Sequence, residues 1–337
     1  MARIIGIGET VLDILFKNDH PQAAIPGGST FNSIISLGRA GMDCYIVTET
    51  GDDHIGDLTC NYLQRNGVRN TFVSRQQGMK SHLSLAFLNQ QNDAQYVFYK
   101  DHASVRMQAR ELHCQPDDAV LFGSFFSINP AIRPAVKTML QEAHDAGATL
   151  YYDINFRKPH IADLPKVYDA IMENMALSSI VRASTEDLLT LFGTEHCPLW
   201  QQENGPQLAK TLCITDLGST DATIVEQAVS RLYHNLIRHY CQWFICTAGS
   251  GAVYLCTPQF LRTFAVNKIP TVSTVGAGDN FNAGFLYGFV RNGLKISELT
   301  ENDWVTCIEM GKRFAQDVCQ SYENSISPVL ACSLKQQ

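Results

Sequence analysis

The sequence has no long hydrophobic run and no excess of basic residues. No apolar stretch reaches the roughly 18 residues that a membrane-spanning helix needs, so no membrane segment is expected. Lys and Arg together number 26 against 33 Asp and Glu, which gives a net charge of −7 at pH 7. Because nucleic-acid affinity comes mainly from neutralising phosphates, this mildly acidic chain is a poor candidate for a general nucleic-acid binder.

The opening of the chain lacks the features of a signal peptide, and the cysteines lack a pairing pattern. A short apolar run at Met1–Gly8 leads directly to Glu9 and Asp13, which fits a first buried strand. The 11 cysteines are an odd number, are scattered from Cys44 to Cys332 and contain no CxxC pair. This pattern lacks the clustered ligands of a zinc site and indicates reduced thiols in a cytoplasmic protein.

Two common phosphate-binding motifs are also missing. There is no GxxxxGK[ST] segment, and the pair Gly6-x-Gly8 has no third glycine at position 11. The sequence therefore excludes a P-loop and a dinucleotide-binding fingerprint. If the protein handles nucleotides, it does so by another route.

Apolar residues are abundant enough for a large core. Hydrophobic residues make up 45% and charged residues 18% of 337 residues, which excludes global disorder and fits one large α/β domain or two smaller ones. Strand-like and helix-like runs alternate, with strands expected at 3–8, 44–47, 119–122, 149–154 and 243–247 and helices at 30–39, 131–146 and 184–192. This alternation predicts a doubly wound, mostly parallel sheet flanked by helices, with ligands at the carboxyl ends of the strands.

Two stretches depart from this alternation. Between about 71 and 105, the β-like runs Leu83–Leu88 and Gln95–Tyr99 flank a polar turn, which predicts a β insertion that acts as a lid. Between 198 and 228 the signals are mixed. Leu212–Thr215 has the composition of a strand, and the polar run Asp216–Asp221 that of a disordered loop.

The strongest chemical signal is a turn of small residues followed by an acid. Gly276, Ala277 and Gly278 precede Asp279, and aromatic residues then recur every four positions, at Phe281, Phe285 and Phe289. This predicts a buried helix that begins at the glycines, whose free N–H groups and positive dipole end form an anion site. A carboxylate would repel a phosphate, so Asp279 is interpreted as a base acting on a hydroxyl; the alternative is a helix cap.

Four further clusters place polar groups at turns or strand ends. They are Gly28 with Asn32, Asp13 beyond the first strand, Asn155 with Arg157 after the strand at 149–154, and Thr247 with Gly249 and Gly251. Each suits a small polar ligand or a phosphate. Taken singly, each also fits an ordinary turn, a solvated acid or a surface ion pair.

Together the five clusters resemble the PfkB/ribokinase family of sugar kinases along nearly the whole chain. The segment GGSTFN at 27–32, followed by LGRAG at 37–41, is similar to the N-terminal signature of the family. The segment STVGAGD at 273–279 is similar to its C-terminal DTxGAGD signature, and GDDHIG at 51–56 to its GxDxxG turn. The paired signatures have the order and separation of the family.

The resemblance implies a single ribokinase-like domain over 1–337 and ATP-dependent phosphoryl transfer to a hydroxymethyl group of a sugar. It implies that Asp279 is the base and that the anion hole is formed by Gly276, Ala277 and Gly278. The sugar hydroxyls would be held by Asp13, Gly28 and Asn32. The phosphates would lie near Asn155 and Arg157, and the nucleotide would contact Thr247, Gly249 and Gly251. Mg²⁺ would bridge the ATP phosphates, and the lid implies a homodimer.

Three positions depart from the family pattern. The first residue of the C-terminal signature, normally Asp, is Ser273, in a loop where some members bind a monovalent cation such as K⁺. The NxxE motif, which organises Mg²⁺ through water, aligns with residues 184–187, so its acid is Asp187 or Glu186. Finally, Asn280 follows the base where a smaller residue is usual, and it either fills space or touches substrate.

The opening of the chain bears on the substrate. The pattern Gly8-Glu9-Thr10-x-x-Asp13 resembles fructokinases and 2-keto-3-deoxygluconate kinases more than adenosine kinases, which favours fructose or a similar ketose. A nucleoside kinase is the alternative within the class. A non-catalytic sugar- or nucleotide-binding regulator on the same fold is the alternative outside it, and the altered Mg²⁺ motif is its only support.

Overall fold

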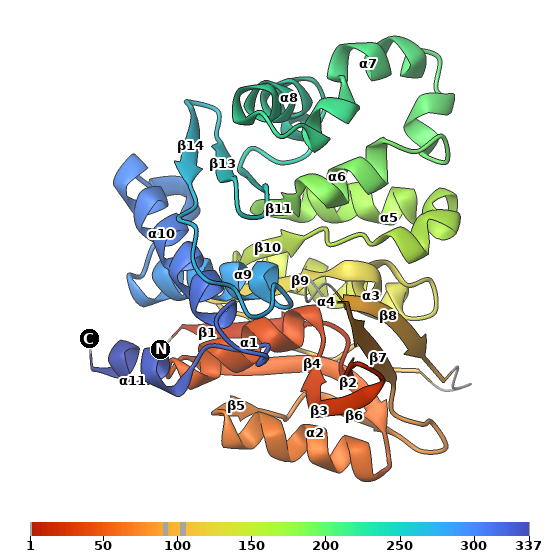
Figure 1. Cartoon of the computed structure of the whole chain (residues 1–337), viewed down its shortest axis with the longest axis vertical. Coiled ribbons are helices and arrows are strands. Elements are labelled where there is room, and N and C mark those ends of the chain that lie inside the picture. The colour runs from red at the N-terminus through yellow and green to blue at the C-terminus, as the bar shows by residue number, and fades with distance from the viewer. Residues whose placement is uncertain (1, 90–93, 102–105, 337) are drawn as a thin grey trace.

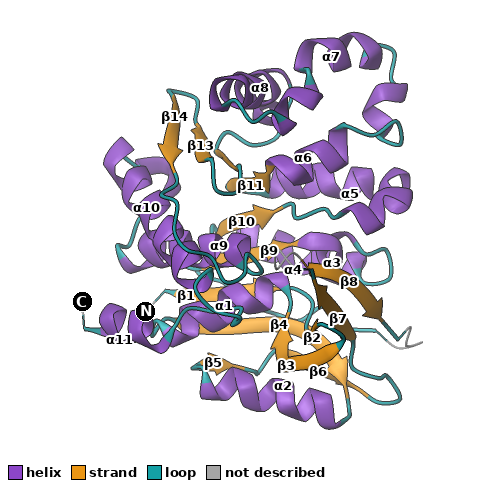
Figure 2. Cartoon of the chain, in the orientation of Figure 1, coloured by secondary structure: helices purple, strands orange, loops and turns teal. Residues whose placement is uncertain are grey.

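Within the residues that this computed structural model describes, 2–89, 94–101 and 106–336, a ten-stranded sheet runs through the molecule with helices on both faces (Figures 1 and 2). The strands of this main sheet are β1 (Arg3–Ile7), β4 (Asp43–Gly51), β5 (Val68–Arg69), β6 (Val73–Gln76), β9 (Ala119–Gly123), β10 (Thr149–Asp153), β11 (Ile180–Ser184), β12 (Phe244–Thr247), β13 (Ala252–Cys256) and β14 (Leu261–Ala265).

The helices are α1 (Ser29–Arg39), α2 (His54–Arg65), α3 (Ser124–Ile128), α4 (Arg133–Asp145), α5 (Leu164–Leu177), α6 (Thr185–Phe192), α7 (Gly205–Leu212), α8 (Ala222–Asn235), α9 (Ala277–Arg291), α10 (Glu301–Val318) and α11 (Pro328–Lys335). Helices lie at the four places predicted for them, as α1, α4, α6 and α9, and further helices occur between and after them. Short 3₁₀ turns lie at Lys158–Asp163, Pro198–Gln201, Ile214–Gly218, Ile237–His239 and Ile296–Glu298. No helix within the described ranges combines the length and apolarity needed to cross a bilayer.

The strand order of the main sheet is β14-β13-β12-β11-β10-β9-β1-β4-β5, with β6 paired to β4. The pairs from β12 to β5 are parallel, whereas β13 and β14 run antiparallel at one edge. Successive side chains of β1 point to opposite faces of the sheet and belong to two separate hydrophobic cores. Ile4 belongs to the core formed with α1 and α9, and Ile5 to the core formed with α4 and α5. The predicted doubly wound, mostly parallel sheet is confirmed.

A second, small sheet of four strands lies beside the main one (Figure 2). Its order is β3-β2-β7-β8, formed by β3 (His20–Gly27), β2 (Val11–Lys17), β7 (Leu83–Leu88) and β8 (Ala94–Tyr99). The segment 71–105 thus supplies half of it, while β6 within that segment joins the main sheet. The other half comes from residues 11–27, because β2 pairs in parallel with β7 across about 70 residues of sequence.

The segment 198–228 is helical, so the strand predicted at Leu212–Thr215 is wrong. Leu212 ends α7, and a 3₁₀ turn and α8 follow. The buried side chains of Leu212, Ile214 and Leu217 contribute to the core beneath α6 and α8. The predicted loop at Asp216–Asp221 is likewise ordered, since Asp221 caps α8 by accepting from the Thr223 N–H. Short apolar runs do not distinguish a strand from a buried helical turn.

Candidate active site

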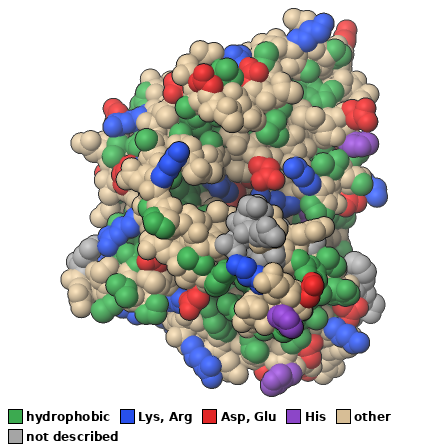
Figure 3. All heavy atoms as spheres, viewed as in Figure 1, with side chains coloured by type: hydrophobic (Ala, Val, Ile, Leu, Met, Phe, Trp, Pro, Cys, Tyr) green, Lys and Arg blue, Asp and Glu red, His purple; other side chains and the backbone are tan. Residues whose placement is uncertain are grey.

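Polar residues gather where the parallel strands end at one edge of the main sheet. Asp153 is the last residue of β10, Ser184 ends β11 and Thr247 ends β12. The surface is hollowed next to α9, and basic and acidic side chains border the hollow (Figure 3). This is the edge at which an open α/β sheet binds its ligands.

The turn before α9 has the geometry of an anion site. Gly276 has φ +79° and is the N-cap, so α9 begins at Ala277, as the sequence predicts. The first N–H groups of a helix have no acceptor within the helix and face outward at its positive end. Of these, the Ala277 N–H donates to the Thr274 carbonyl at 3.2 Å. Gly276, Ala277 and Gly278 are hereafter called the anion turn.

Asp279, in the first turn of α9, is held by α1. Its Oδ1 accepts from the Ser29 hydroxyl at 2.8 Å, and its Oδ2 accepts from the Asn32 amide at 2.8 Å. The Ser33 hydroxyl donates to the backbone carbonyl of Asp279 at 2.7 Å. Because the carboxylate bonds to α1, the structure does not support its interpretation as a helix cap.

Burial raises the pKa of Asp279 to about 6, against the hydrogen bonds from Asn32 and Ser29, which favour the ionised form. The charge of Asp153 also raises this pKa, and the charge of Arg157 lowers it. A carboxyl group with a pKa near neutrality is suited to general-base chemistry, because it is ionised at pH 7 and still binds a proton readily.

Asp13 lies in β2 and is only 8% exposed, so its interpretation as a solvated loop acid is wrong. Burial, with the charges of Asp279 and Glu9, raises the pKa of Asp13 to about 7. A Cβ on Gly27 would overlap Asp13 Oδ2, and Gly28 has φ +126°, where a Cβ would overlap the Glu9 carbonyl oxygen. The two glycines are therefore required by close approach and by backbone conformation.

Asn32 completes this side of the crevice. It is buried in α1, and its Nδ2 donates to Asp279. Its Oδ1 is buried with no hydrogen-bond partner among the described residues. Buried polar atoms are rarely left unpaired, so this oxygen is available to a ligand. The structure thus brings together Asp13, Gly28, Asn32 and Asp279, which are far apart in sequence.

An ion pair that sequence reasoning missed lies beneath the anion turn. Arg182 of β11 is 4% exposed and donates to Asp153 Oδ1 at 2.9 Å and to Thr247 Oγ1 at 2.6 Å. A Cβ on Gly278 would lie 3.0 Å from its guanidinium. Asn282 of α9 donates to the other oxygen of Asp153 at 2.7 Å. An arginine inside the apolar run of β11 was the signal available in the sequence.

The residues predicted to contact the nucleotide form a tight turn between β12 and β13. The Thr247 hydroxyl is engaged by Arg182. Beyond it, the Gly251 N–H donates to the Ala248 carbonyl. Gly249 has φ +52°, and no described atom lies within 4 Å of the position that a Cβ would occupy there. This turn therefore offers exposed backbone groups and few side chains.

Asn155 and Arg157 follow β10 at the same edge. Asn155 is buried with φ +40°, and within the described ranges its Oδ1 has no partner. Arg157 is 53% exposed, and its guanidinium lies 3.8 Å from Asp187 Oδ1 and 4.0 Å from Glu186. Arg157 lies four residues beyond the carboxyl end of β10, and its charge lowers the pKa of Asp279.

The acids of the altered NxxE motif lie beside Arg157. Asp187 forms a capping box with Ser184, accepting from the Ser184 N–H at 2.9 Å and hydroxyl at 2.6 Å through Oδ2. Its Oδ1 is buried and has no hydrogen-bond partner in the part of the chain described, while Glu186 is exposed. No group of three His, Cys, Asp or Glu that could hold a metal occurs among the described residues.

The two remaining departures from the family pattern have structural partners. Ser273 is buried, and its hydroxyl accepts from the Val275 N–H at 3.2 Å. Asn280 is fully buried, and its side chain is hydrogen-bonded within the protein. Its Nδ2 donates to the carbonyls of Gly276 at 2.8 Å and Asn324 at 2.9 Å, and its Oδ1 accepts from the Ser36 hydroxyl.

The turn at 51–56 anchors the small sheet. Asp53 caps α2 by accepting from the Gly56 N–H at 2.9 Å. The same carboxylate accepts from the N–H and the hydroxyl of Ser81, at 2.8 and 2.7 Å, just before β7. This motif therefore positions the small sheet relative to the main sheet.

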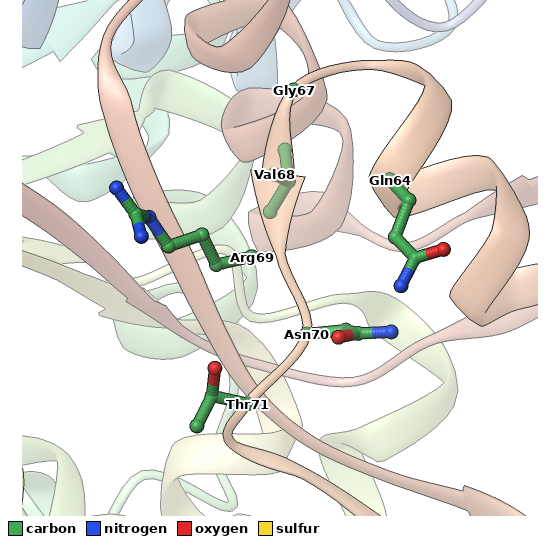
Figure 4. Close-up of a pocket in the computed structure, with 6 residues that line it drawn as sticks. All are labelled: Gln64, Gly67, Val68, Arg69, Asn70 and Thr71. Carbon is green, nitrogen blue, oxygen red and sulfur yellow. The ribbon is translucent and has the colours of Figure 1, made fainter.

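A separate hollow between α2 and β5 contains none of the predicted site residues (Figure 4). Its lining consists of Gln64, Gly67, Val68, Arg69, Asn70 and Thr71. β5 pairs with the N-terminal part of β4, through Cys44 and Tyr45, so this hollow lies at the opposite ends of the strands from the crevice.

Comparison with known proteins identifies a family. Residues 22–330 match the sequence profile of the pfkB family carbohydrate kinases. Aminoimidazole riboside kinase of Salmonella typhimurium is 24% identical over 294 residues, which cover 86% of this chain and 82% of that protein. Fructokinase of Escherichia coli is 24% identical over 301 residues, with 88% and 87% covered.

Solved structures share the fold. Fructokinase from Vibrio cholerae O395, in its fructose, ADP and calcium ion bound form, superposes with a TM-score of 0.76 at 15% identity, over 99% of both chains. Aminoimidazole riboside kinase from Salmonella enterica, complexed with aminoimidazole riboside and an ATP analog, gives 0.74 at 18% identity, again over 99% of both chains. The predicted ribokinase-like fold is confirmed.

Proposed function

The chain belongs to the pfkB family of carbohydrate kinases, and we propose that it transfers the γ-phosphoryl group of ATP to a hydroxymethyl group of fructose or a similar ketose. The observation that carries this proposal is the pairing of Asp279 with Ser29 and Asn32 at the start of α9. It places a carboxylate with a pKa of about 6 in the first turn of α9, at the positive end of that helix. Relatives named fructokinase support the choice of a ketose as the acceptor.

The proposed reaction uses these two features together. Asp279 removes the proton of the acceptor hydroxyl, and the hydroxyl oxygen attacks the γ-phosphorus. The bond between that phosphorus and the bridging oxygen breaks, and ADP leaves with the bond's electrons. A positioned base contributes about 10²–10⁴-fold, and most of the remaining acceleration comes from positioning and charge stabilisation.

The phosphoryl group would be received by the anion turn, Gly276 to Gly278. The buried cation of Arg182 lies behind this turn, and Arg157 with Asn155 lies at the crevice edge. Thr247 shapes the next turn through Arg182, and the exposed backbone at Gly249 and Gly251 would contact the nucleotide. Fixed donors of this kind stabilise charge without reorganising during the reaction.

The acceptor would be held by Asp13, Gly28 and Asn32. Carboxylate and amide oxygens accept from hydroxyl groups, so this pocket suits a neutral polyol rather than an acidic sugar. Glu9 of the opening motif is already engaged, accepting from His82 at 3.1 Å and from Lys100 at 2.9 Å. Despite burial, these contacts lower the pKa of Glu9 to about 2. The ionised Glu9, which follows β1 of the main sheet, therefore links that sheet to the small sheet through His82 and Lys100.

Mg²⁺ fits this crevice only as an ion shared with ATP. The Oδ1 of Asp187, which accepts no hydrogen bond from the described residues, and the exposed Glu186 would hold it through water. When bound, the ion supplies charge neutralisation on the phosphates. Chelation should abolish turnover, and Asp187→Asn should raise the Mg²⁺ concentration needed for half-maximal rate. Activation by K⁺ is tested in the same assay by replacing K⁺ with a bulky organic cation.

The small sheet is proposed to close over the acceptor and to form a homodimer. Phe87, Val97 and Tyr99 are exposed apolar side chains of β7 and β8, and burying such a surface against a second copy removes it from water. Sedimentation of the protein and of a Val97→Glu variant tests this proposal, which a monomeric wild-type protein would contradict. All eleven cysteines are free thiols, which supports a reducing, cytoplasmic location.

A coupled ADP-release assay over a panel of acceptors tests the function. The panel contains fructose, other ketoses, ribose, 2-keto-3-deoxygluconate, aminoimidazole riboside and adenosine. We expect a ketose to give the highest kcat/KM. A nucleoside as the best acceptor would replace the proposed substrate, and no turnover with any acceptor, despite a raised melting temperature with sugar and an unreactive ATP analogue, would favour the non-catalytic regulator.

A further inference from the structure

The loop between α10 and α11, residues 319–327, reaches the proposed acceptor site from the far end of the chain. It leads into α11, which lies next to α1 (Figure 1). Within it, Asn324 is 2% exposed, and its Nδ2 lies 3.4 Å from Asp13 Oδ2 and about the same distance from the Cβ position of Gly27. The side chain of Asn324 thus supports the carboxylate that is proposed to hold the acceptor.

The backbone of Asn324 is hydrogen-bonded, through Asn280, to the anion turn. The Asn324 carbonyl accepts from Asn280 Nδ2 at 2.9 Å, and this nitrogen also donates to the Gly276 carbonyl of the anion turn at 2.8 Å. One amide group therefore joins the turn proposed to receive the phosphoryl group to the loop that contacts Asp13.

Helix α1 forms hydrogen bonds both with Asn280 and with the loop at 319–327. The Ser36 hydroxyl donates to Asn280 Oδ1 and accepts from the Ile326 N–H at 3.0 Å. The same helix carries Asn32 and Ser29, which hold the base Asp279. The loop, α1 and the start of α9 consequently form one hydrogen-bonded unit around the crevice.

The side chain of Asn324 is not fully satisfied by this unit. Its Oδ1 is buried and finds no hydrogen-bond partner among the described residues. An unpaired buried polar atom costs free energy, and an anchoring residue with no other role would not need it. Such an atom next to a proposed binding carboxylate indicates a role in that binding.

We propose that Asn324 is a positioning residue of the kinase: through its side chain it orients Asp13 toward the acceptor, and through Asn280 it couples that position to the anion turn. This inference rests on the proposed function. It predicts that Asn324 affects binding of the acceptor more than binding of ATP, which contacts other elements. A purely structural loop anchor would lower stability and leave both KM values unchanged.

The test compares Asn324→Ala with wild type on the best acceptor of the panel. We expect the KM for the acceptor to rise by about ten- to a hundredfold, the effect of losing one hydrogen bond to a charged group, with the KM for ATP within about twofold. Asn174→Ala is the matched control: this buried amide of α5 bonds Arg133 and Ser127 away from the crevice. It should lower stability and leave both KM values unchanged.

A double-mutant cycle tests whether Asn324 acts through Asp13. In the Asp13→Asn background, Asn324→Ala should add little to the rise in acceptor KM, because the carboxylate that it orients is gone. Full additivity would overturn the proposed route. Combined with Asn280→Ala, the effect on kcat/KM should be smaller than the product of the single effects.

The outcomes separate this inference from the function on which it rests. If Asn324→Ala does not fold, Asn324→Ser, which keeps a small polar side chain, is measured in its place with the same expected KM split. Wild-type turnover with an unchanged acceptor KM in these variants would overturn the inference and leave the kinase intact. An absence of wild-type turnover on every acceptor would overturn both.

Discussion

The two sides of the crevice are built differently. On the proposed acceptor side, Asp13, Asn32 and Asp279 are side chains held in place by contacts from other segments. On the proposed nucleotide side, the turn at 248–251 presents exposed backbone, and the buried hydroxyl of Thr247 just before it is taken by Arg182. We therefore expect function on the first side to depend on particular side chains, and on the second side to depend on backbone shape.

The largest expected effect is at the ion pair that lies between the two sides. Arg182→Met leaves Asp153 buried without its partner, which should destabilise the fold by about 3–5 kcal/mol. It should also lower kcat by about a hundredfold, since the support of the anion turn is lost. Thermal unfolding measures the loss of stability, and steady-state kinetics measures the loss of kcat. Arg182→Lys should recover part of the stability and part of kcat. Arg133→Met, at the ion pair with Glu173, should leave kcat unchanged.

A smaller loss is expected at Gly28 on the acceptor side. Gly28→Ala forces a side chain at φ +126° against the Glu9 carbonyl, which should cost about 1–3 kcal/mol of stability and raise the acceptor KM. Gly78→Ala is the matched control, because Gly78 has φ +76° with no described atom near its Cβ position. Equal acceptor KM values in the two variants would contradict the role of Gly28.

The acceptor side should also set the pH dependence. Asp13 and Asp279 are proposed to act as carboxylates, and their pKa values are about 7 and about 6. Because protonation inactivates each group, kcat/KM for the acceptor should fall as pH drops below about 7 and should fall more steeply below about 6. A pH profile checks this; a rate that stays level from pH 8 to pH 5 would contradict it.

Arg157, on the phosphate side, should have a modest effect. It is half-exposed and its ion pairs are long, so Arg157→Gln should raise the KM for ATP by about two- to fivefold and leave the acceptor KM unchanged. Steady-state kinetics at two salt concentrations checks this. The difference from wild type should shrink at high salt, because exposed charges are screened.

The smallest effect is expected in the nucleotide turn. Gly249 has φ +52°, which a residue with a Cβ adopts at a modest cost, and its Cβ position is open within the described part of the chain. Gly249→Ala should therefore change the KM for ATP by no more than about threefold, the equivalent of about 0.6 kcal/mol. If Gly249→Ala raised the KM for ATP as much as Gly28→Ala raises the KM for the acceptor, the nucleotide side would be as sensitive to an added side chain as the acceptor side. That result would contradict the difference between the two sides.

The alternation of apolar runs was enough to predict the type of sheet and the strands β1, β4, β9, β10 and β12, because each of these carries a local pattern. The strands β5, β6, β11, β13 and β14 of the same sheet were not predicted. The small sheet was predicted only in part. β2 pairs with β7 about 70 residues away, and no local pattern indicates a pairing between distant segments. The strand predicted at Leu212–Thr215 was wrong for a related reason, since burial rather than periodicity decides such short runs.

In the candidate site, too, features with a local sequence pattern were predicted and features set by distant contacts were not. The small-residue turn before Asp279 and the glycines before α1 were visible as motifs in the sequence. Arg182, Asn282 and Asn324 were not, because their importance arises from contacts with residues at least 29 positions away. A polar residue inside an apolar strand, as at Arg182, was the one local sign of this network.

The most direct test of the account is the rate of phosphoryl transfer by Asp279→Asn under single-turnover conditions with saturating acceptor. The substitution keeps the shape of the side chain and removes the base, so the rate should fall by at least about a hundredfold while the acceptor still binds. Asp303→Asn, an aspartate in the first turn of α10 with similar bonds to Thr300, should transfer at the wild-type rate. An Asp279→Asn variant within tenfold of wild type would contradict the central claim.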